Sequence, residues 1–389
     1  MVNKVNESEL KNQIVKKIIK YGLIAIVLIA LIVVVSLYLG NRNARLWINK
    51  NILKRDIGEE DLPNIQINNE NAKVFSYGDK VAILENGTLS IYSASTKKIS
   101  DIQVSLANPI YDTQGNYLLL ADKDESNFYL IDNDKIQWQK SVDGNISKIT
   151  VNKNGAVGIV VTNTTYKSII IMYDSTGTEC FKTYLGSTLA TDITISNNSK
   201  YLSFIEINTT GASIISKVKT ISIDKAKNEP KDAIIYTYDL DTNVLAIKIK
   251  YYNDDIMLLT DTSLNKLNDG NIQKIEDLSD DVSFVDITLD KNIAEIKENK
   301  SKEIKNEYEL DFINDENQKV NIYYFDDTIK SMICYDDKVA LNFGSQIEFV
   351  NTRGNLVKKY TSLKNIKEVQ LTSKIATIIF KDNIEIISF

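Results

Sequence analysis

The feature of this sequence that most constrains its fold is a polar turn followed by a short apolar strand, a motif that occurs eight times. A period of about 40–45 residues with four strands per repeat is typical of a β-propeller, and the mean spacing here is about 42 residues. We therefore predict an all-β fold, a β-propeller of eight four-stranded blades. Seven blades are the alternative, if residues 242–326 form one irregular blade. The equivalent apolar positions are Val81, Leu118, Val157, Leu202, Met257, Ile293, Val339 and Ala376.

The two ends of the repeat region predict how the ring closes. Too few residues follow Ala376 to complete a four-stranded blade, whereas the strand-like segment 63–68 belongs to no other repeat. We expect residues 63–68 to pair with the last blade beside Ile384–Phe389, because closure removes the open edges of the sheet assembly. The longest repeat contains an insertion, residues 208–232, which we interpret as one long hairpin ending in a loop.

One segment near the N-terminus belongs to no soluble fold. Residues 22–39 contain no charge and are long enough, as a helix, to cross most of a hydrocarbon layer about 30 Å thick. The residues that follow, 40–45, lack the cleavage site of a signal peptide. We therefore expect a transmembrane helix that binds the lipid bilayer. The expected domains are a short basic head at 1–20, the transmembrane helix at 21–40, a juxtamembrane stem at 41–62 and the β-propeller at 63–389.

The charges are divided unevenly along the chain. Residues 1–55 carry a net charge of +8 and the remaining residues −14, so nucleic acid is an unfavourable partner for the propeller. Basic residues flank the apolar segment almost equally, so charge alone does not set its orientation. A short head is easily retained while long domains translocate largely regardless of charge. We expect a single-pass protein of the cell membrane, with a cytoplasmic N-terminus and a monomeric, extracytoplasmic propeller.

Several classes of chemistry are excluded by residue types and motifs. The sequence contains no histidine, no phosphate-binding glycine motif and no G-x-S-x-G nucleophile motif. We therefore predict no catalytic residue, no cofactor-binding residue, no metal ligand and no cofactor. The two cysteines, Cys180 and Cys334, form no C-x-x-C pair. Isolated thiols buried on strands are favoured, and a disulfide between them stays open.

Three further patterns have a structural interpretation that we prefer to a functional one. Residues 122–127 begin like a calcium-binding loop but lack its glycine at position six, and Asn133 replaces the expected glutamate at position twelve. We interpret this segment as a polar tip between the second and third strands of the second blade. Adjacent acids are predicted to be solvated loop charges, and clustered aromatic residues to pack between blades. The acids are Glu59-Glu60-Asp61, Asp280-Asp281, Asp326-Asp327 and Asp336-Asp337, and the aromatic groups are Tyr236 with Tyr238, Tyr251-Tyr252 and Tyr323-Tyr324-Phe325.

The turns between paired strands in residues 110–121 and 150–161 carry an Asp/Asn-x-x-Gly pattern. They resemble the inner hairpins of tryptophan–aspartate-repeat and quinoprotein-like propellers. With its basic N-terminus, one apolar segment and about 320 further residues, the whole chain resembles an uncharacterised clostridial family of membrane-anchored propeller proteins. The resemblance implies a fold and a location but no chemistry, because its motifs are structural turns. The Trp-Asp dipeptide and periodic tryptophans are absent, which argues against a bound quinone.

Two hypotheses of function follow. The first is a non-enzymatic binding or scaffolding module that holds a protein or cell-envelope ligand outside the membrane. The second is an envelope glycan hydrolase or lyase that uses carboxylates at the central channel. Two inward carboxylates in opposed environments would favour the enzyme, whereas a wide channel lined by Asn, Ser and aliphatic residues would favour the binding module. Propellers host many functions, so the fold alone does not decide.

Overall fold

A computed structural model describes residues 2–40, 48, 57–58 and 62–389, apart from residues 70, 253, 291, 302 and 315. The chain divides into two compact units, residues 1–61 and 62–389. The first unit contains the long helix α1 (Val2–Gly40) and the two-residue strand β1 (Ile57–Gly58). Within the described residues, α1 is the one helix long and apolar enough to cross a membrane, over Lys16–Ser36 with a mean hydropathy of 3.0. An N-terminal signal sequence meets the same criteria of length and apolar composition, so this segment is a candidate for either role.

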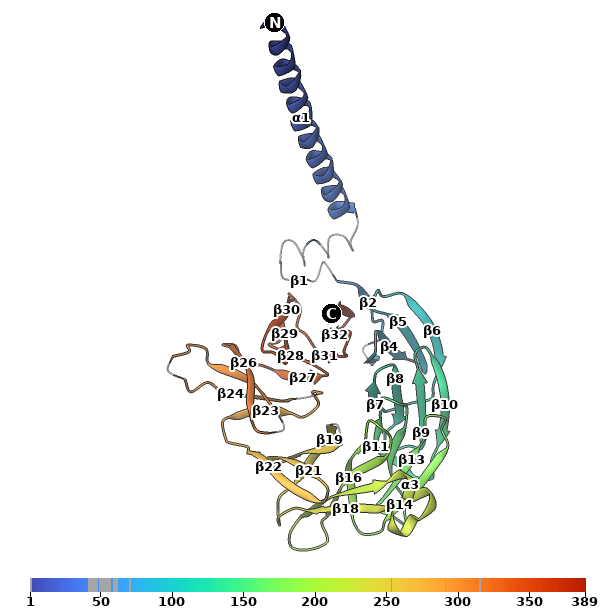
Figure 1. Cartoon of the computed structure of the whole chain (residues 1–389). Helices are drawn as coiled ribbons and strands as arrows, with labels where there is room; N and C mark the ends of the chain where they lie inside the picture. The colour runs from blue at the N-terminus through green and yellow to red at the C-terminus, as the bar shows by residue number, and fades with distance from the viewer. Residues whose placement is uncertain are drawn as a thin grey trace. The chain divides into compact units, whose positions relative to one another are not determined.

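The second unit is a β-propeller of eight blades, each a four-stranded antiparallel sheet (Figure 1). Blades 1 and 2 contain β3 (Lys73–Tyr77), β4 (Lys80–Glu85), β5 (Thr88–Ser93), β6 (Lys98–Gln103), β7 (Pro109–Gln114), β8 (Tyr117–Asp122), β9 (Asn127–Asp132) and β10 (Lys135–Ser141). Blades 3 and 4 contain β11 (Asn145–Val151), β12 (Val157–Thr162), β13 (Ser168–Tyr173), β14 (Glu179–Leu185), β15 (Leu189–Ile195), β16 (Tyr201–Asn208), β17 (Ile215–Ser222) and β18 (Ile234–Asp239).

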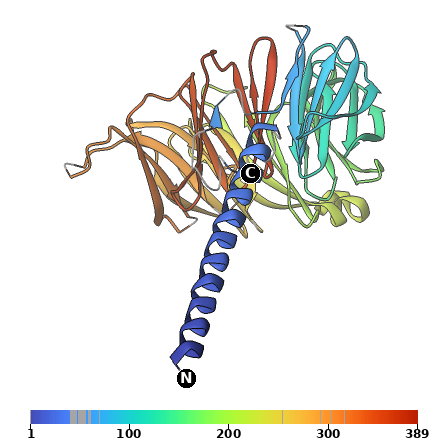
Figure 2. The same cartoon turned by 90° about the horizontal axis from the view of Figure 1, so that it is seen from above.

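The remaining blades follow in chain order around the ring, as a second view also shows (Figure 2). Residues 242–326 form two separate blades, so the prediction of eight is confirmed and the seven-blade alternative is wrong. Blades 5 and 6 contain β19 (Ala246–Tyr252), β20 (Asp255–Thr260), β21 (Ser263–Asn268), β22 (Asn271–Asp277), β23 (Val282–Asp286), β24 (Ile293–Glu298), β25 (Tyr308–Ile313) and β26 (Lys319–Phe325). Blades 7 and 8 contain β27 (Ser331–Tyr335), β28 (Lys338–Asn342), β29 (Gln346–Asn351), β30 (Leu356–Thr361), β31 (Glu368–Leu371), β32 (Ile375–Ile379), β33 (Asn383–Ser388) and β2 (Asn64–Gln66).

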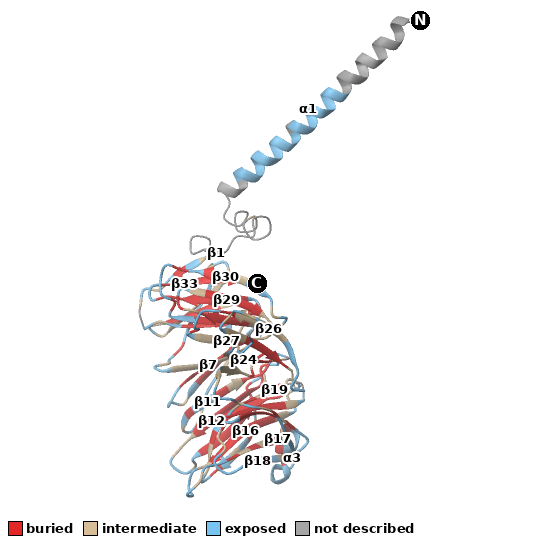
Figure 3. Ribbon diagram, turned by 90° about the vertical axis from the view of Figure 1, so that its left-hand side faces the viewer, coloured by how far each residue is buried: buried red, intermediate tan, exposed pale blue. Residues whose placement is uncertain are grey.

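The second strand of every blade contains one of the eight equivalent apolar positions. All eight side chains are at most 3% exposed, because each blade is covered on both faces by its neighbours. Strands two and three therefore consist of continuous apolar runs, as in β12 and β13. The fourth strand lies at the outer edge, so its exposure alternates, as in β10. Figure 3 shows the buried residues concentrated within the blades.

The Asp/Asn-x-x-Gly turns join the first and second strands of blades 2 and 3. Gly115 and Gly155 have φ values of +58° and +78°, in the left-handed region that favours glycine. At Gly155 a Cβ atom would also lie 2.8 Å from the ring of Tyr117, so both backbone conformation and space select glycine there.

Blade 8 is built from both ends of the propeller unit. Strand β2 pairs antiparallel with β33, with Ile65 opposite Ile384. Ile65 is buried and packs in one apolar cluster with Val81 of blade 1 and Ile386 of blade 8. The predicted closure by residues 63–68 is therefore confirmed.

The joint between blades 8 and 1 is also polar. The Gln370 side chain accepts a hydrogen bond from Ser76 N (2.9 Å) and donates one to the Val74 carbonyl (2.9 Å). The Thr372 hydroxyl donates to the Gly78 carbonyl at 2.6 Å. These buried bonds connect residues almost 300 positions apart, which only the closed ring brings together.

The interpretation of residues 208–232 as one long hairpin is wrong. Strands β16 and β17 form a hairpin joined by residues 209–214, but the insertion continues beyond β17 into α3 (Ile223–Asn228) and the 3₁₀ helix η3 (Pro230–Asp232). Ser222 caps α3 by accepting from Lys225 N, and Ile223 and Ala226 pack into the apolar cluster between blades 3 and 4. Pro at the first position of η3 suits a helical start, which explains the helical turns in place of strand.

We predict that Ile65→Ala destabilises the whole propeller cooperatively. Removing a buried Ile side chain costs about 2–5 kcal/mol, which should lower the melting temperature of the propeller by more than about 4 °C. Thermal unfolding followed by circular dichroism measures it, and the exposed neighbour Gln66→Ala is the matched control. A melting temperature within about 2 °C of the native protein would show that β2 is a dispensable tail.

Candidate binding site in the central channel

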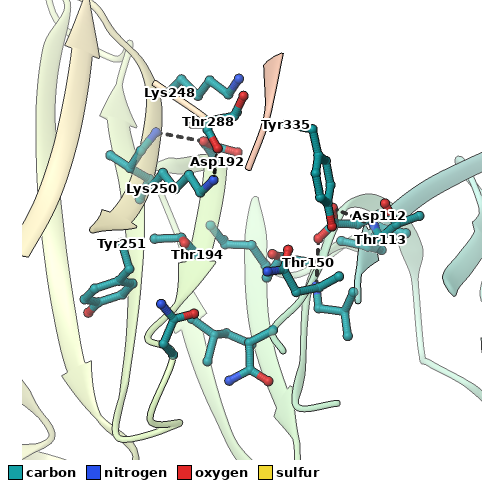
Figure 4. A pocket seen from close by; sticks show the side chains of 18 of the residues that line it. Asp112, Thr113, Thr150, Asp192, Thr194, Lys248, Lys250, Tyr251, Thr288 and Tyr335 are labelled. Atoms are coloured by element: carbon teal, nitrogen blue, oxygen red, sulfur yellow. Dashed lines mark hydrogen bonds between the residues drawn. The ribbon is translucent and has the colours of Figure 1, made fainter. Parts of the chain in front are cut away.

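A pocket of 510 Å³ lies in the central channel of the ring. The first strands of blades 2–5 form one part of its wall, namely β7, β11, β15 and β19. The rest comes from β27 and from the turns that follow β23, β27 and β31. The first strand of each blade runs beside the ring axis, so the ends of these strands meet at one end of the channel. Figure 4 shows the side chains that point into this space.

The pocket is lined by charges of both signs. Hydroxyl, amide and aliphatic side chains complete the lining, and Figure 4 shows Lys248, Lys250 and Thr288 on one side and Asp112, Thr113 and Tyr335 on the other. The carboxylates are Asp112, Asp192, Asp290 and Asp336, and the ammonium groups are Lys148, Lys248 and Lys250. Sequence analysis named Asp336 only as a solvated loop charge and assigned no site to the other residues. One sequence pattern could have indicated the pocket: polar residues interrupt the otherwise apolar first strands, as Lys248 and Lys250 do in β19.

Asp112 connects blade 2 to blade 3. Its Oδ2 atom accepts a hydrogen bond from Val151 N on β11 (2.8 Å), and its Oδ1 atom accepts from Thr113 N (2.9 Å). Burial raises the pKa of the Asp112 carboxyl, and these hydrogen bonds oppose that effect. The carboxylate is therefore held by backbone donors of two blades.

Asp192 makes the equivalent connection between blades 4 and 5. It is 5% exposed, and its Oδ2 atom accepts from Ile249 N on β19 at 3.0 Å. Its Oδ1 atom lies 2.9 Å from the Nζ atom of Lys148 on β11 of blade 3. Three blades thus meet at one carboxylate.

Lys250 is the most enclosed cation of the pocket. Its ammonium donates to the Thr288 carbonyl, and burial lowers its pKa. The neighbouring Lys248 lies 3.4 Å from Asp286 at the end of β23. Blades 5 and 6 are therefore joined by two lysines of one strand.

Asp336 and Asp290 are neighbours in the pocket wall, on the turns that follow β27 and β23. Burial raises the pKa of the Asp336 carboxyl, and the nearby Asp337 and Asp290 raise it further. The Asp290 N–H donates to the Asp336 carbonyl at 2.8 Å, which fixes the two turns together. Burial also raises the pKa of the Tyr335 phenol.

Both cysteines are free, so the open question of a disulfide between them is settled. Cys334 is buried in the channel wall on β27, and burial raises the pKa of its thiol well above the ordinary value. Cys180 lies on β14 and is only partly buried, so the expectation of two buried thiols holds for Cys334 alone. A thiol with a raised pKa is a poor nucleophile.

The segment at residues 122–127 joins β8 to β9, so it is the predicted polar tip of blade 2. Asp122 is buried and its two oxygens accept from Ala107 N (2.8 Å) and Asn108 N (2.6 Å). These bonds fix the loop between blades 1 and 2. Among the described residues, no group of three or more Cys, Asp or Glu side chains could hold a metal ion.

The adjacent acids differ from one another. Asp326 and Asp327 are exposed loop charges, as predicted, and Lys300 lies 2.7 Å from Asp281 and helps to lower its pKa to about 2. Asp336 is the exception because it lines the channel pocket. The acids at residues 59–61 lie outside the described residues.

The prediction of aromatic packing between blades is confirmed for part of the set. Tyr238, Tyr251 and Phe325 are buried in clusters between blades. Tyr236 and Tyr323 are half-buried and their hydroxyls donate to carboxylates, Asp269 (3.0 Å) and Glu348 (2.9 Å).

The chain belongs to a family of unknown function, DUF5711, whose profile matches residues 60–389. No curated protein matches the sequence significantly. The match covers the whole propeller unit.

Solved structures confirm the fold class. The C-terminal WD40 domain of Sif2 is similar with a TM-score of 0.54 and 11% identity, covering 84% of this chain and 97% of that one. Sqt1 from Chaetomium thermophilum, bound to the N-terminus of ribosomal protein L10, has a TM-score of 0.50 and 8% identity, covering 86% and 99%. BamB from Moraxella catarrhalis has a TM-score of 0.49 and 9% identity, covering 84% and 98%.

We predict that Asp336→Asn stabilises the protein at neutral pH. The raised pKa means that the folded state favours the protonated carboxyl, so ionisation costs stability as pH rises, and an amide avoids that cost. Asn also tolerates the positive φ of this residue (+56°). The melting temperature should rise by about 1–2 °C at pH 7, and this gain should shrink toward pH 4.

The matched control is Asp327→Asn, which removes an exposed loop carboxylate that does not contribute to the shift at Asp336. It should bring no such gain. A melting temperature of Asp336→Asn that is lower than the native value at pH 7 would contradict the assignment.

Proposed function

We propose that this protein is a non-enzymatic binding or scaffolding module whose channel mouth holds an extended segment of a partner protein. The observation that carries the proposal is a pocket with charges of both signs whose carboxylates are fixed by the neighbouring blades. Such a surface is preorganised, so little conformational entropy is lost when a ligand binds. A peptide with acidic and basic side chains suits it better than a ligand of one charge.

The shape of the site supports a protein ligand. Strands of several blades present backbone and side-chain groups around one opening, so a chain segment can contact several of them at once. One structure of similar fold, Sqt1, is described as bound to the N-terminus of a ribosomal protein. We infer a comparable use of the propeller here, with a partner of the cell envelope.

The enzyme alternative has one observation in its favour. The pocket contains carboxylates in different environments, and Asp336 has a raised pKa beside Asp290, as an acid of a glycosidase would have. Asp112 and Asp192, in contrast, are occupied by backbone N–H groups of adjoining blades. Release of reducing sugar from cell-wall material, lost in Asp336→Asn, would favour the hydrolase.

We further propose that α1 anchors the protein in the cell membrane and that the propeller lies outside. The apolar stretch Lys16–Ser36 is long enough to cross the hydrocarbon layer, and a short basic head favours a cytoplasmic N-terminus. The proposed order is head, transmembrane helix, stem and monomeric propeller, with bounds at residues 20, 40 and 62. The acidic propeller makes nucleic acid an unfavourable partner.

We expect a photo-crosslinking residue at the channel mouth to capture the partner in intact cells. Gln114 and Asn197 both line the pocket, so benzoylphenylalanine at either position should give a discrete crosslinked product. The same residue at Ile99, exposed on the outer strand β6, is the matched control. Products that form equally from Ile99, or from Ile99 alone, would move the binding surface away from the channel.

We expect protease added to intact, wall-free cells to cleave the propeller. The connection between β16 and β17, residues 209–214, is largely exposed and should be cut first. Immunoblotting with an antibody to the C-terminus detects the fragment, and a cytoplasmic protein serves as the control. Complete protection until the membrane is lysed would place the propeller in the cytoplasm.

A further inference from the structure

A second cleft, separate from the channel pocket, lies between blades 4 and 5. Its volume is 270 Å³, and it is lined by residues from strands β16 to β21 and from the turns that follow β15, β19 and β21. Tyr251 borders both the cleft and the channel pocket, so the two open near one another. We call this space the tyrosine cleft because Tyr201, Tyr236, Tyr238 and Tyr251 line it.

The hydroxyls of three of these tyrosines are fixed by hydrogen bonds. The Tyr251 hydroxyl lies 2.7 Å from Ser203 Oγ, and the Tyr236 hydroxyl donates to Asp269 at 3.0 Å. The Tyr238 hydroxyl accepts from Gly270 N at 3.4 Å. The three tyrosines are therefore held in place before any ligand arrives, and together with Tyr201 they supply aromatic surface to the lining of the cleft.

The rim of the cleft is polar. Asn198 belongs to blade 4 and Asp254 to the neighbouring blade 5, and the Asn198 amide donates a hydrogen bond to Asp254 at 3.3 Å. Lys200 and Asp269 complete the rim, so it offers both donors and acceptors around an aromatic wall. These four rim residues are exposed, so their polar groups are accessible to a ligand.

We propose that the tyrosine cleft binds a neutral or amino sugar of an envelope glycan. A sugar ring presents an apolar C–H face, which packs against an aromatic ring, and an edge of hydroxyls, which pair with amides and carboxylates. The cleft offers both surfaces side by side, and its volume suits a single sugar ring. Two carboxylates against one lysine disfavour an acidic sugar.

A quaternary ammonium ligand fits the cleft less well. A cation of that kind needs the faces of several aromatic rings around it. Tyr238 and Tyr251 are only 3% and 6% exposed, so Tyr236 and Tyr201 provide most of the accessible ring surface. The site is distinct from the channel, so its test is independent of the partner protein proposed above.

The test uses the full-length protein in detergent and saturation-transfer NMR with N-acetylglucosamine trisaccharide, maltotriose and choline as probes. We expect one of the two saccharides to bind and choline not to bind. Tyr236→Ala should weaken that binding at least tenfold, whereas Tyr236→Phe, which keeps the ring, should stay within about threefold of the native protein. Tyr184→Ala, at an exposed tyrosine of β14, is the matched control and should change nothing.

A second variant keeps the proposal testable if Tyr236→Ala fails to fold. Asp254→Ala removes an exposed rim carboxylate and should weaken saccharide binding without lowering the melting temperature. Binding of choline alone, no binding of either saccharide at millimolar concentration, or equal binding by Tyr236→Ala would each overturn the proposal. If no partner is crosslinked at the channel but the sugar still binds, the proposed function fails and the proposal for the tyrosine cleft stands.

Discussion

Closure of the ring is the constraint on which the rest of the structure depends. Blade 8 has its fourth strand only because β2, from the start of the propeller unit, pairs with β33 at the end of that unit. Without this pairing β33 would present an open edge. On the inner side of the same joint, buried hydrogen bonds connect Gln370 of β31 to blade 1. The positions of all eight first strands, and hence the channel, follow from that closed ring.

The polar groups of the channel are also part of its construction. Asp112 and Asp192 each use a side-chain oxygen to satisfy a backbone N–H of the next blade, where the sheet of one blade offers no partner. Lys148 and Lys250 then link further blades through Asp192 and Thr288. These groups stabilise the joints between blades, and the same fixed charges form the surface that a ligand meets. Rigidity and recognition therefore come from one set of residues.

The turns between first and second strands border two sites of different chemical character at one end of the ring. On the axis they border a channel of mixed charge, and between blades 4 and 5 they border the tyrosine cleft. Tyr251 of β19 separates the two spaces, with its hydroxyl bonded to Ser203 of blade 4. A single face thus carries two surfaces of different chemistry, one suited to a peptide and one to a sugar, on a scaffold that needs no movement to present them.

The sequence by itself determined the strand class, the eight repeats and the closing strand. Second strands such as β12 are buried on both faces, so their apolar runs are conspicuous, and a spare strand before the first repeat has one place to pair. Helix α3 was missed because a six-residue helix has almost no periodicity, and its stability comes from packing against blade 3. The channel and the tyrosine cleft were decided by tertiary structure alone. The charged residues of the pocket lie far apart in the chain, as Asp112, Asp192, Lys250 and Asp336 show. They line one pocket only because the ring places the first strand of each blade beside one axis.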